Sequence, residues 1–198
     1  MTWLTAREFD AAVLELRRAA ALAPESPLVI QALRALNVDV GPEAASEPPS
    51  QILVDMDPRL HEAAVALARR AAGRLGRLLW QDGRFTEAAL LLQLAAEEGG
   101  SASTWFDLGL ARQDLRDFSG AEEAYSKALA GHPEHVAAAF NLGLVLQQQG
   151  KWDLATKFYG VAYKLQGSMF GSIITAMAAG PHGRLWLDSD NLRRILAE

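Results

Sequence analysis

The sequence predicts an all-α fold of stacked helical hairpins, because several kinds of residue recur together at a fixed period. The dipeptide Leu-Gly occurs at Leu75-Gly76, Leu108-Gly109 and Leu142-Gly143, which are 33 and 34 residues apart. An aromatic residue, an alanine, a large apolar residue and a second alanine follow in the same register. These four columns contain Phe85, Phe118 and Trp152; Ala88, Ala121 and Ala155; Leu92, Tyr125 and Tyr159; and Ala95, Ala128 and Ala162.

Each repeat splits into two helical patterns separated by a turn. The turns read "WQDGRF", "LRDF" and "QQGKW", which contain the small and polar residues that interrupt helices. The Leu-Gly pair of the first helix and the alanines of the second fall where the two helices would cross. Because small side chains let helix axes approach closely, each repeat is expected to form one helical hairpin.

The repeat resembles the tetratricopeptide repeat (TPR). The resemblance rests on the period, the Leu-Gly pair, the Gly-x-aromatic-x-x-Ala turn and Pro133 between two repeats, and it covers residues 69 to 167. It departs from the family pattern at Arg116, where a turn glycine is usual, and at Gly100 and Gly167, where proline is common. The resemblance implies a TPR-type helical-hairpin solenoid with three clear repeats, a partial N-terminal repeat and C-terminal capping helices.

The N-terminal part is expected to contain a partial TPR-like helical hairpin over residues 1–36. A fragment there matches the second half of a repeat through Arg7-Glu8-Phe9, Ala12, Leu16, Ala19 and Pro24. Residues 37–57 form a Pro/Glu-rich linker or loop, because glycine and proline cluster there without a helical period.

The three-repeat array is expected to span residues 58–167. It begins at Asp57-Pro58, an N-cap followed by proline at the first helical position, which predicts a helix over residues 58–82. Residues 168–198 form a C-terminal capping helix and a tail. The segment "SMFGSIITAMAAG" predicts the capping helix, and the tail is read as a short extended piece and a last helix that starts near Ser189 or Asp190.

Composition narrows the classes of partner. The 198 residues contain 19 Lys and Arg against 24 Asp and Glu, a formal net charge of −5, which argues against nucleic acid as a partner. The chain contains no cysteine, so disulfides and thiolate chemistry are excluded. Every long apolar stretch is broken by Arg, Gln or Glu, so no membrane span is expected. Together with a start that does not read as a secretory signal, this predicts a cytoplasmic location.

The sequence predicts no enzyme, no catalytic residue, no cofactor and no metal site. The one local histidine cluster, His132-Pro133-Glu134-His135, lies at a repeat junction and lacks a nearby third ligand. Gly150-Lys151 lacks the spacing and the hydroxyl residue of a phosphate-binding loop. The aromatic residues Trp105, Phe118, Tyr125, Trp152 and Tyr159 occupy repeat-defining columns, so we expect them in the core.

The resemblance also implies a candidate binding site, because in TPR proteins the first helix of each hairpin lines a concave groove. The corresponding columns contain Arg70, Arg74, Arg77 and Gln81 in the first repeat; Phe106, Leu110, Gln113 and Asp114 in the second; and Phe140, Asn141, Leu144 and Gln148 in the third. The competing interpretation is that the protein itself covers the apolar centre of this groove. The linker segment Ile52-Leu53-Val54 or the C-terminal tail would then lie over it.

The expected function is therefore a protein- or peptide-binding scaffold or adaptor. TPR co-chaperones that capture the C-terminal carboxylate of heat-shock proteins are disfavoured. Their basic and amide clamp falls here on Gly73, Arg77, Asp107, Ala137 and Asn141, of which only Asn141 fits. Two alternatives stay open: a chaperone for a secreted client, similar to the three-repeat chaperones of type III secretion, and an accessory or regulatory subunit of an enzyme. The sequence also leaves self-association open.

Overall fold

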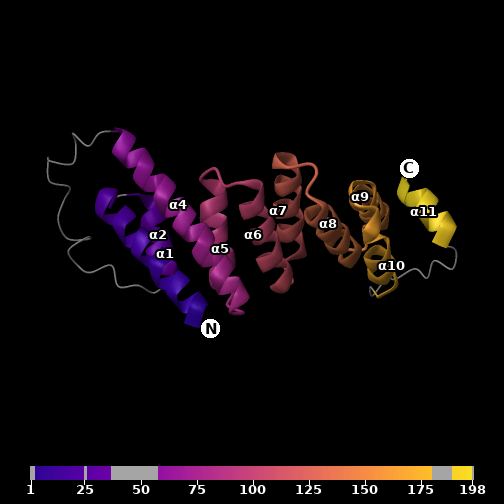
Figure 1. The fold of residues 1–198 in the computed structure, drawn as a ribbon, viewed down its shortest axis with the longest axis horizontal. Coiled ribbons are helices and arrows are strands. Elements are labelled where there is room, and N and C mark those ends of the chain that lie inside the picture. The colour runs from indigo at the N-terminus through magenta and orange to yellow at the C-terminus, as the bar shows by residue number, and fades with distance from the viewer. Residues whose placement is uncertain (1–2, 25, 37–57, 180–188, 198) are drawn as a thin grey trace. The chain divides into compact units, whose positions relative to one another are not determined.

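The computed structural model describes residues 3–24, 26–36, 58–179 and 189–197. All regular elements within these ranges are helices, which confirms the predicted all-α fold (Figure 1). The expected linker at residues 37–57 and the extended piece before Ser189 lie outside the described residues. The chain divides into two compact units, Met1–Gly100 and Ser101–Glu198.

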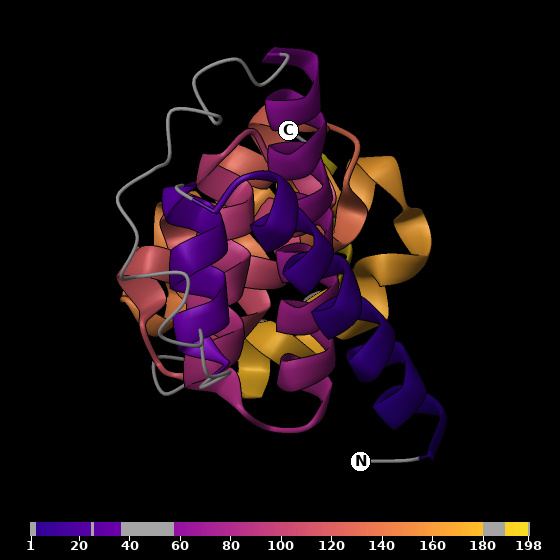
Figure 2. The same ribbon diagram turned by 90° about the vertical axis from the view of Figure 1, so that its left-hand side faces the viewer.

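The first unit is a helical layer organised around one long helix. Its helices are α1 (Trp3–Leu22), α2 (Pro27–Ala35), α4 (Pro58–Gln81) and α5 (Phe85–Glu97). Helix α4 packs against both α1 and α5, and α2 contacts the other three; Figure 2 looks onto this unit. The buried residues of α1 and of the first half of α4 are mostly alanines, among them Ala12, Ala19, Ala64 and Ala68. Small side chains on both helices allow this close packing.

The second unit contains two hairpins and two C-terminal helices. Its elements are α6 (Ala102–Asp114), α7 (Phe118–Gly131), α8 (Val136–Gln148), α9 (Trp152–Leu165), the 3-10 turn η2 (Gly167–Met169), α10 (Phe170–Ala179) and α11 (Ser189–Ala197). Helix α6 pairs with α7 and α8 with α9, while α7 packs against α8 and α11 packs against α9. One cluster of buried side chains runs through the unit, from Ala121 and Tyr125 to Ile173 on α10 and Leu196 on α11.

In each hairpin, the glycine of the Leu-Gly column faces a large side chain of the second helix. A Cβ atom on Gly143 would lie 2.6 Å from Cε1 of Tyr159, and one on Gly76 would lie 2.6 Å from Cγ of Leu92. In the middle hairpin, Gly109 faces the ring of Tyr125 in the same way. The large apolar column therefore fills the space that the glycine column leaves, which explains why the two columns recur together.

The turns inside the hairpins share one backbone conformation. Gly83 and Gly150 have φ angles of 79° and 76°, and Arg116, at the same column of the middle repeat, has a φ angle of 60°. Residues with a Cβ atom rarely adopt this left-handed backbone conformation. Arg116 therefore replaces the usual turn glycine, while the turn keeps the same left-handed backbone conformation.

The expectation that all five aromatic residues are core is only partly met. Tyr125 and Tyr159 are completely buried, whereas Trp105, Phe118 and Trp152 keep part of their surface exposed. Phe118 and Trp152 are the first residues of α7 and α9, so no preceding turn of the same helix lies beside their side chains.

Candidate functional site

The first helices of the two hairpins in the second unit present a face of apolar side chains. Phe106 on α6 and Phe140 on α8 are 34 residues apart and have the same environment. Each ring packs on the buried tyrosine of its own hairpin, with centroids 5.8 Å apart in both Phe106–Tyr125 and Phe140–Tyr159. Both phenylalanines remain partly exposed, as do Leu110 and Leu144. We use the name α6–α8 face for the eight residues predicted on these two helices.

Two polar residues of the α6–α8 face are hydrogen-bonded to the scaffold. The hydroxyl of Tyr125 donates to Oε1 of Gln113 over 2.8 Å and accepts from Nδ2 of Asn141 over 3.5 Å. Burial raises the pKa of Tyr125 well above its ordinary value, so its hydroxyl keeps the proton it donates. The side chains of Gln113 and Asn141 are thus both hydrogen-bonded to the hydroxyl of Tyr125.

Two of the eight residues lie at helix ends. Asp114 is the last residue of α6 and is exposed, and Gln148 is the last residue of α8 and is partly exposed. Helix α8 contains no charged residue from Val136 to Gln148. Helix α8 therefore places no charged side chain beside Phe140 and Leu144.

The four residues predicted on α4 belong to the other compact unit. Arg70, Arg74, Arg77 and Gln81 are all exposed. Arg74 is already engaged, because its Nη1 lies 3.1 Å from both carboxylate oxygens of Glu15 on α1. The ion pair joins residues 59 positions apart, so no local sequence pattern could have indicated it.

His135 borders the α6–α8 face, although the sequence pattern assigned it no functional role. Its ring lies 4.6 Å from that of Phe106, centroid to centroid, and its Nδ1 accepts a hydrogen bond from the backbone N–H of Ala138 over 3.2 Å. This makes His135 the N-cap of α8. Burial lowers the pKa of His135, and the nearby His132 lowers it further. The signal that could have revealed this role is its place just before an apolar helix.

A polar contact holds the two hairpins of the second unit together. Nε2 of Gln149 donates to the carbonyl oxygen of Phe118 over 3.0 Å and to Oε2 of Glu122 over 2.8 Å. Nζ of Lys151 donates to the same carboxylate over 2.7 Å. Burial alone would raise the pKa of Glu122, but the hydrogen bonds from Lys151 and Gln149 outweigh it and the pKa is lowered. The turn of one hairpin is thereby fixed to the second helix of the previous one.

The described residues leave the apolar side chains of the α6–α8 face partly uncovered. Ile52-Leu53-Val54 lies outside the described residues. Helix α10 contacts α8 through Gln147, whose Nε2 donates to the carbonyl oxygen of Ala176 over 2.8 Å. With α10 and α11 in these positions, Phe140 and Leu144 are still partly exposed.

The described residues meet neither the requirements of a metal site nor those of a membrane-spanning helix. Within the part of the chain that the structure describes, no group of three or more His, Cys, Asp or Glu side chains could hold a metal ion. None of the described helices combines the length and the apolar character that crossing a bilayer requires.

Comparison with known proteins identifies the repeat. The family model described as "Tetratricopeptide repeat" matches residues 56–103 and 106–168, more than half of the chain. A comparison with curated proteins finds no match.

Two solved structures share the fold. The crystal structure of MamA is 18% identical, with a TM-score of 0.56 over 68% of this chain and 88% of that chain. The crystal structure of BtubC (BKLC) from P. vanneervenii is also 18% identical, with a TM-score of 0.50 over 100% of this chain and 92% of that chain. Identity this low shows the fold alone. The chain belongs, on its family match, to the tetratricopeptide repeat family, whose fold serves as a protein-interaction scaffold.

Proposed function

We propose that the protein is a binding module that holds a segment of another protein on the α6–α8 face. The observation that supports this proposal is the set of four apolar side chains, Phe106, Leu110, Phe140 and Leu144, at equivalent columns of two consecutive hairpins. Each packs on the core cluster with one flank and keeps the other partly exposed. Where such side chains form a contiguous apolar patch, the patch is typical of an interaction site.

The face is rigid before binding, which favours affinity. The two phenylalanine rings rest on buried tyrosines, and the Gln149–Glu122 and Lys151–Glu122 contacts fix one hairpin to the next. A receptor that is already ordered does not lose side-chain and backbone freedom when the ligand arrives. The cost of ordering then falls mainly on the ligand.

The chemistry of the face selects a segment with apolar anchors. Side chains such as Leu or Phe, in an extended or a helical segment, would pack between Phe106 and Phe140. Polar groups of the ligand backbone would meet the amides of Gln113, Asn141 and Gln148. The exposed residues Arg70, Arg77 and Gln81 of α4 belong to the first unit and are proposed as partner contacts of that unit alone.

The experiment is an affinity capture from the source cells, followed by mass spectrometry. The wild type is compared with Leu110→Glu/Leu144→Glu, which places two charges on the face. Leu154→Glu provides the matched control, because Leu154 is 46% exposed on α9 and lies outside the face. Circular dichroism establishes that each variant is folded.

A partner retained by the wild type and by Leu154→Glu, but lost from the double variant, is the expected result. The captured protein is then purified, and its Kd should rise by at least about tenfold for Phe140→Glu, since central anchors dominate such interfaces. Equal capture by all three proteins, or by none, would show that the α6–α8 face is not the binding surface.

A further inference from the structure

The surface of α9 that faces the C-terminal helix is only partly covered. Helix α11 packs on it and buries Leu192 and Leu196. A Cβ atom on Gly160 would lie 2.8 Å from the carbonyl oxygen of Leu196, so the backbone of α11 approaches α9 closely at this point. However, α11 has 9 residues, whereas α9 has 14. Among the described residues, α11 therefore covers only part of α9.

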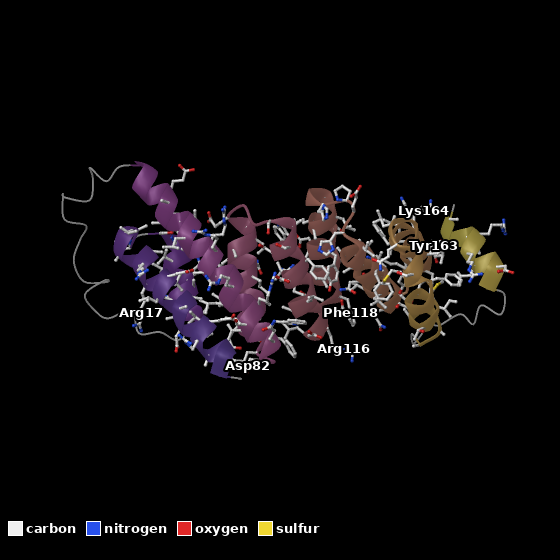
Figure 3. All side chains as sticks on the ribbon, in the orientation of Figure 1. Arg17, Asp82, Arg116, Phe118, Tyr163 and Lys164 are labelled. Atoms are coloured by element: carbon white, nitrogen blue, oxygen red, sulfur yellow. The ribbon has the colours of Figure 1, made fainter. Side chains whose placement is uncertain are left out.

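A cleft of about 350 Å³ lies where α11 leaves α9 uncovered. We call it the α9–α11 cleft. Its walls are formed by Asp153, Thr156, Lys157, Gly160, Val161, Lys164, Ile195 and Leu196. Lys157 and Lys164 are both exposed, and Val161 and Ile195 are partly exposed between the two helices. Lys164 is marked in Figure 3.

The equivalent surface of α7 shows how this part of a repeat packs against the hairpin that follows it. Thr156 stands 34 residues after Glu122 on α7. On α7, Glu122 binds Gln149 and Lys151, which belong to the next hairpin. The equivalent surface of α9 is therefore one on which another helical element stacks, and here α11 fills only part of it.

Helices α9 and α11 together carry a net positive charge, whereas the whole chain carries a net negative charge. Helices α9 and α11 contain Lys157, Lys164, Arg193 and Arg194 but only two acidic residues, Asp153 and Asp190. Nη1 of Arg193 binds Oδ1 of Asp190 over 3.2 Å. The wall of the cleft itself contains two lysines and one acidic residue, Asp153. The whole chain, by contrast, has a net charge of −5. A basic cleft on an acidic protein favours an acidic ligand.

The spacing of the two lysines indicates the form of the ligand. Lys157 and Lys164 are separated by two turns of α9, or about 10 Å at the rise of an α-helix. Carboxylates seven residues apart on a second helix have the same separation and lie on one side of it. Apolar side chains between them would reach Val161 and Ile195.

We propose that the α9–α11 cleft binds an acidic amphipathic helix of a partner protein. Two carboxylates of that helix pair with Lys157 and Lys164, and its apolar side chains pack against Val161 and Ile195. The helix completes the stacking surface of α9 that α11 leaves open. This site is separate from the α6–α8 face and does not depend on the function proposed for that face.

The test uses a phage-displayed library of helical peptides, selected on the full-length protein. The enriched peptides are synthesised with a fluorescent label, and their binding is measured by fluorescence anisotropy. Three charge variants are compared with the wild type: Lys157→Glu/Lys164→Glu, the milder Lys157→Gln/Lys164→Gln, and Arg17→Glu/Arg18→Glu. The last provides the matched control, because Arg17 and Arg18 are exposed on α1 in the other unit (Figure 3 marks Arg17).

The expected result is an enrichment of peptides with two acidic residues seven positions apart. Their Kd should rise by about tenfold or more in the Lys→Glu variant and less in the Lys→Gln variant, and it should rise with salt for the wild type. The Arg17→Glu/Arg18→Glu variant and Phe140→Glu should bind as the wild type does.

Three outcomes would overturn the proposal: no enrichment, enriched peptides without acidic residues, or equal binding by the Lys→Glu variant. Loss of binding in Phe140→Glu alone would place the peptides on the α6–α8 face, which would support the proposed function and reject this site. Sedimentation velocity provides one more test: a dimer of the wild type that dissociates in the Lys→Glu variant would make a second copy the occupant, against the proposal.

Discussion

Tyr159 donates the hydrogen of its hydroxyl to Oε1 of Gln147 over 2.8 Å, deep in the second unit. Both side chains are completely buried, and Nε2 of Gln147 donates in turn to the carbonyl oxygen of Ala176. The bond therefore links the third hairpin internally and connects it to α10. The middle hairpin has the same pair twelve residues apart, Tyr125 and Gln113, but there the glutamine is partly exposed.

The two tyrosines should differ in what their hydroxyl groups contribute to stability. Tyr159→Phe leaves Oε1 of Gln147 buried without a donor, and we expect a loss of about 1 to 3 kcal/mol in the free energy of unfolding. Tyr125→Phe should cost less, about 0.5 to 1 kcal/mol, because both partners of its hydroxyl, Gln113 and Asn141, are partly exposed and water can reach them. Urea denaturation followed by circular dichroism measures both. An equal cost for the two variants would show that burial of the glutamine is not what decides the effect.

The glycine of the Leu-Gly column should not tolerate a methyl group. In Gly143→Ala the new Cβ atom would meet the ring of Tyr159, which is buried and hydrogen-bonded and so has little room to move. We expect a loss of about 1 to 3 kcal/mol from overpacking. Gly171→Ala is the matched control: Gly171 lies in α10 with no atom within 4 Å of such a Cβ atom. It should stabilise the protein by up to about 1 kcal/mol through helix propensity. A loss in both variants would contradict this account.

The hairpins could be predicted from the sequence because they depend on residues that repeat. Gly76, Gly109 and Gly143 recur since each faces a large side chain of its own hairpin, and that contact is the same in every repeat. The candidate site could be predicted less completely. Periodicity places Asn141 on the right face of α8, but it does not reveal the bond to Tyr125, which depends on how two hairpins stack.

Arg116 should be replaceable with a gain in stability. Its left-handed conformation costs a residue with a Cβ atom about 1 kcal/mol or more, and glycine adopts it freely. Its guanidinium lies 5.8 Å from the ring of Phe118, an exposed contact that offsets part of the gain (Figure 3). We therefore expect Arg116→Gly to stabilise the protein by about 0.5 to 1 kcal/mol.

The variant Arg116→Ala separates the two effects in a thermal or urea unfolding experiment. It removes the guanidinium and keeps the backbone strain, so it should be neutral or slightly destabilising. Equal stabilisation by alanine and glycine would mean that the arginine side chain, and not the turn conformation, is unfavourable at this position.

Acid should weaken the fold through His135 before it affects the carboxylates. Nδ1 of His135 can accept the hydrogen bond from Ala138 only while it is unprotonated, and burial lowers the pKa of this histidine from its ordinary value of 6.5. As the pH falls, the unfolded chain takes up the proton first. The stabilising contribution is thus complete above about pH 6.5 and is lost as the pH falls through the lowered pKa of the folded state. The pKa of Glu122 is lowered from 4.5, so its contribution is lost only at lower pH.

The comparison of wild type with His135→Asn isolates this effect, because asparagine is also an N-cap residue but does not titrate. The free energy of unfolding is measured in urea at several values between about pH 8 and about pH 5, a range chosen to span the ordinary histidine pKa. The wild type should lose more stability across this range than the variant. The charged and titratable groups near the ring, Asp107 and His132, are the same in both proteins, so their effects are shared in large part. Parallel curves for the two proteins would show that the cap of α8 does not respond to protonation. A steeper curve for the wild type would connect the N-terminus of α8, and the Phe106 ring stacked against His135, to the pH of the surroundings.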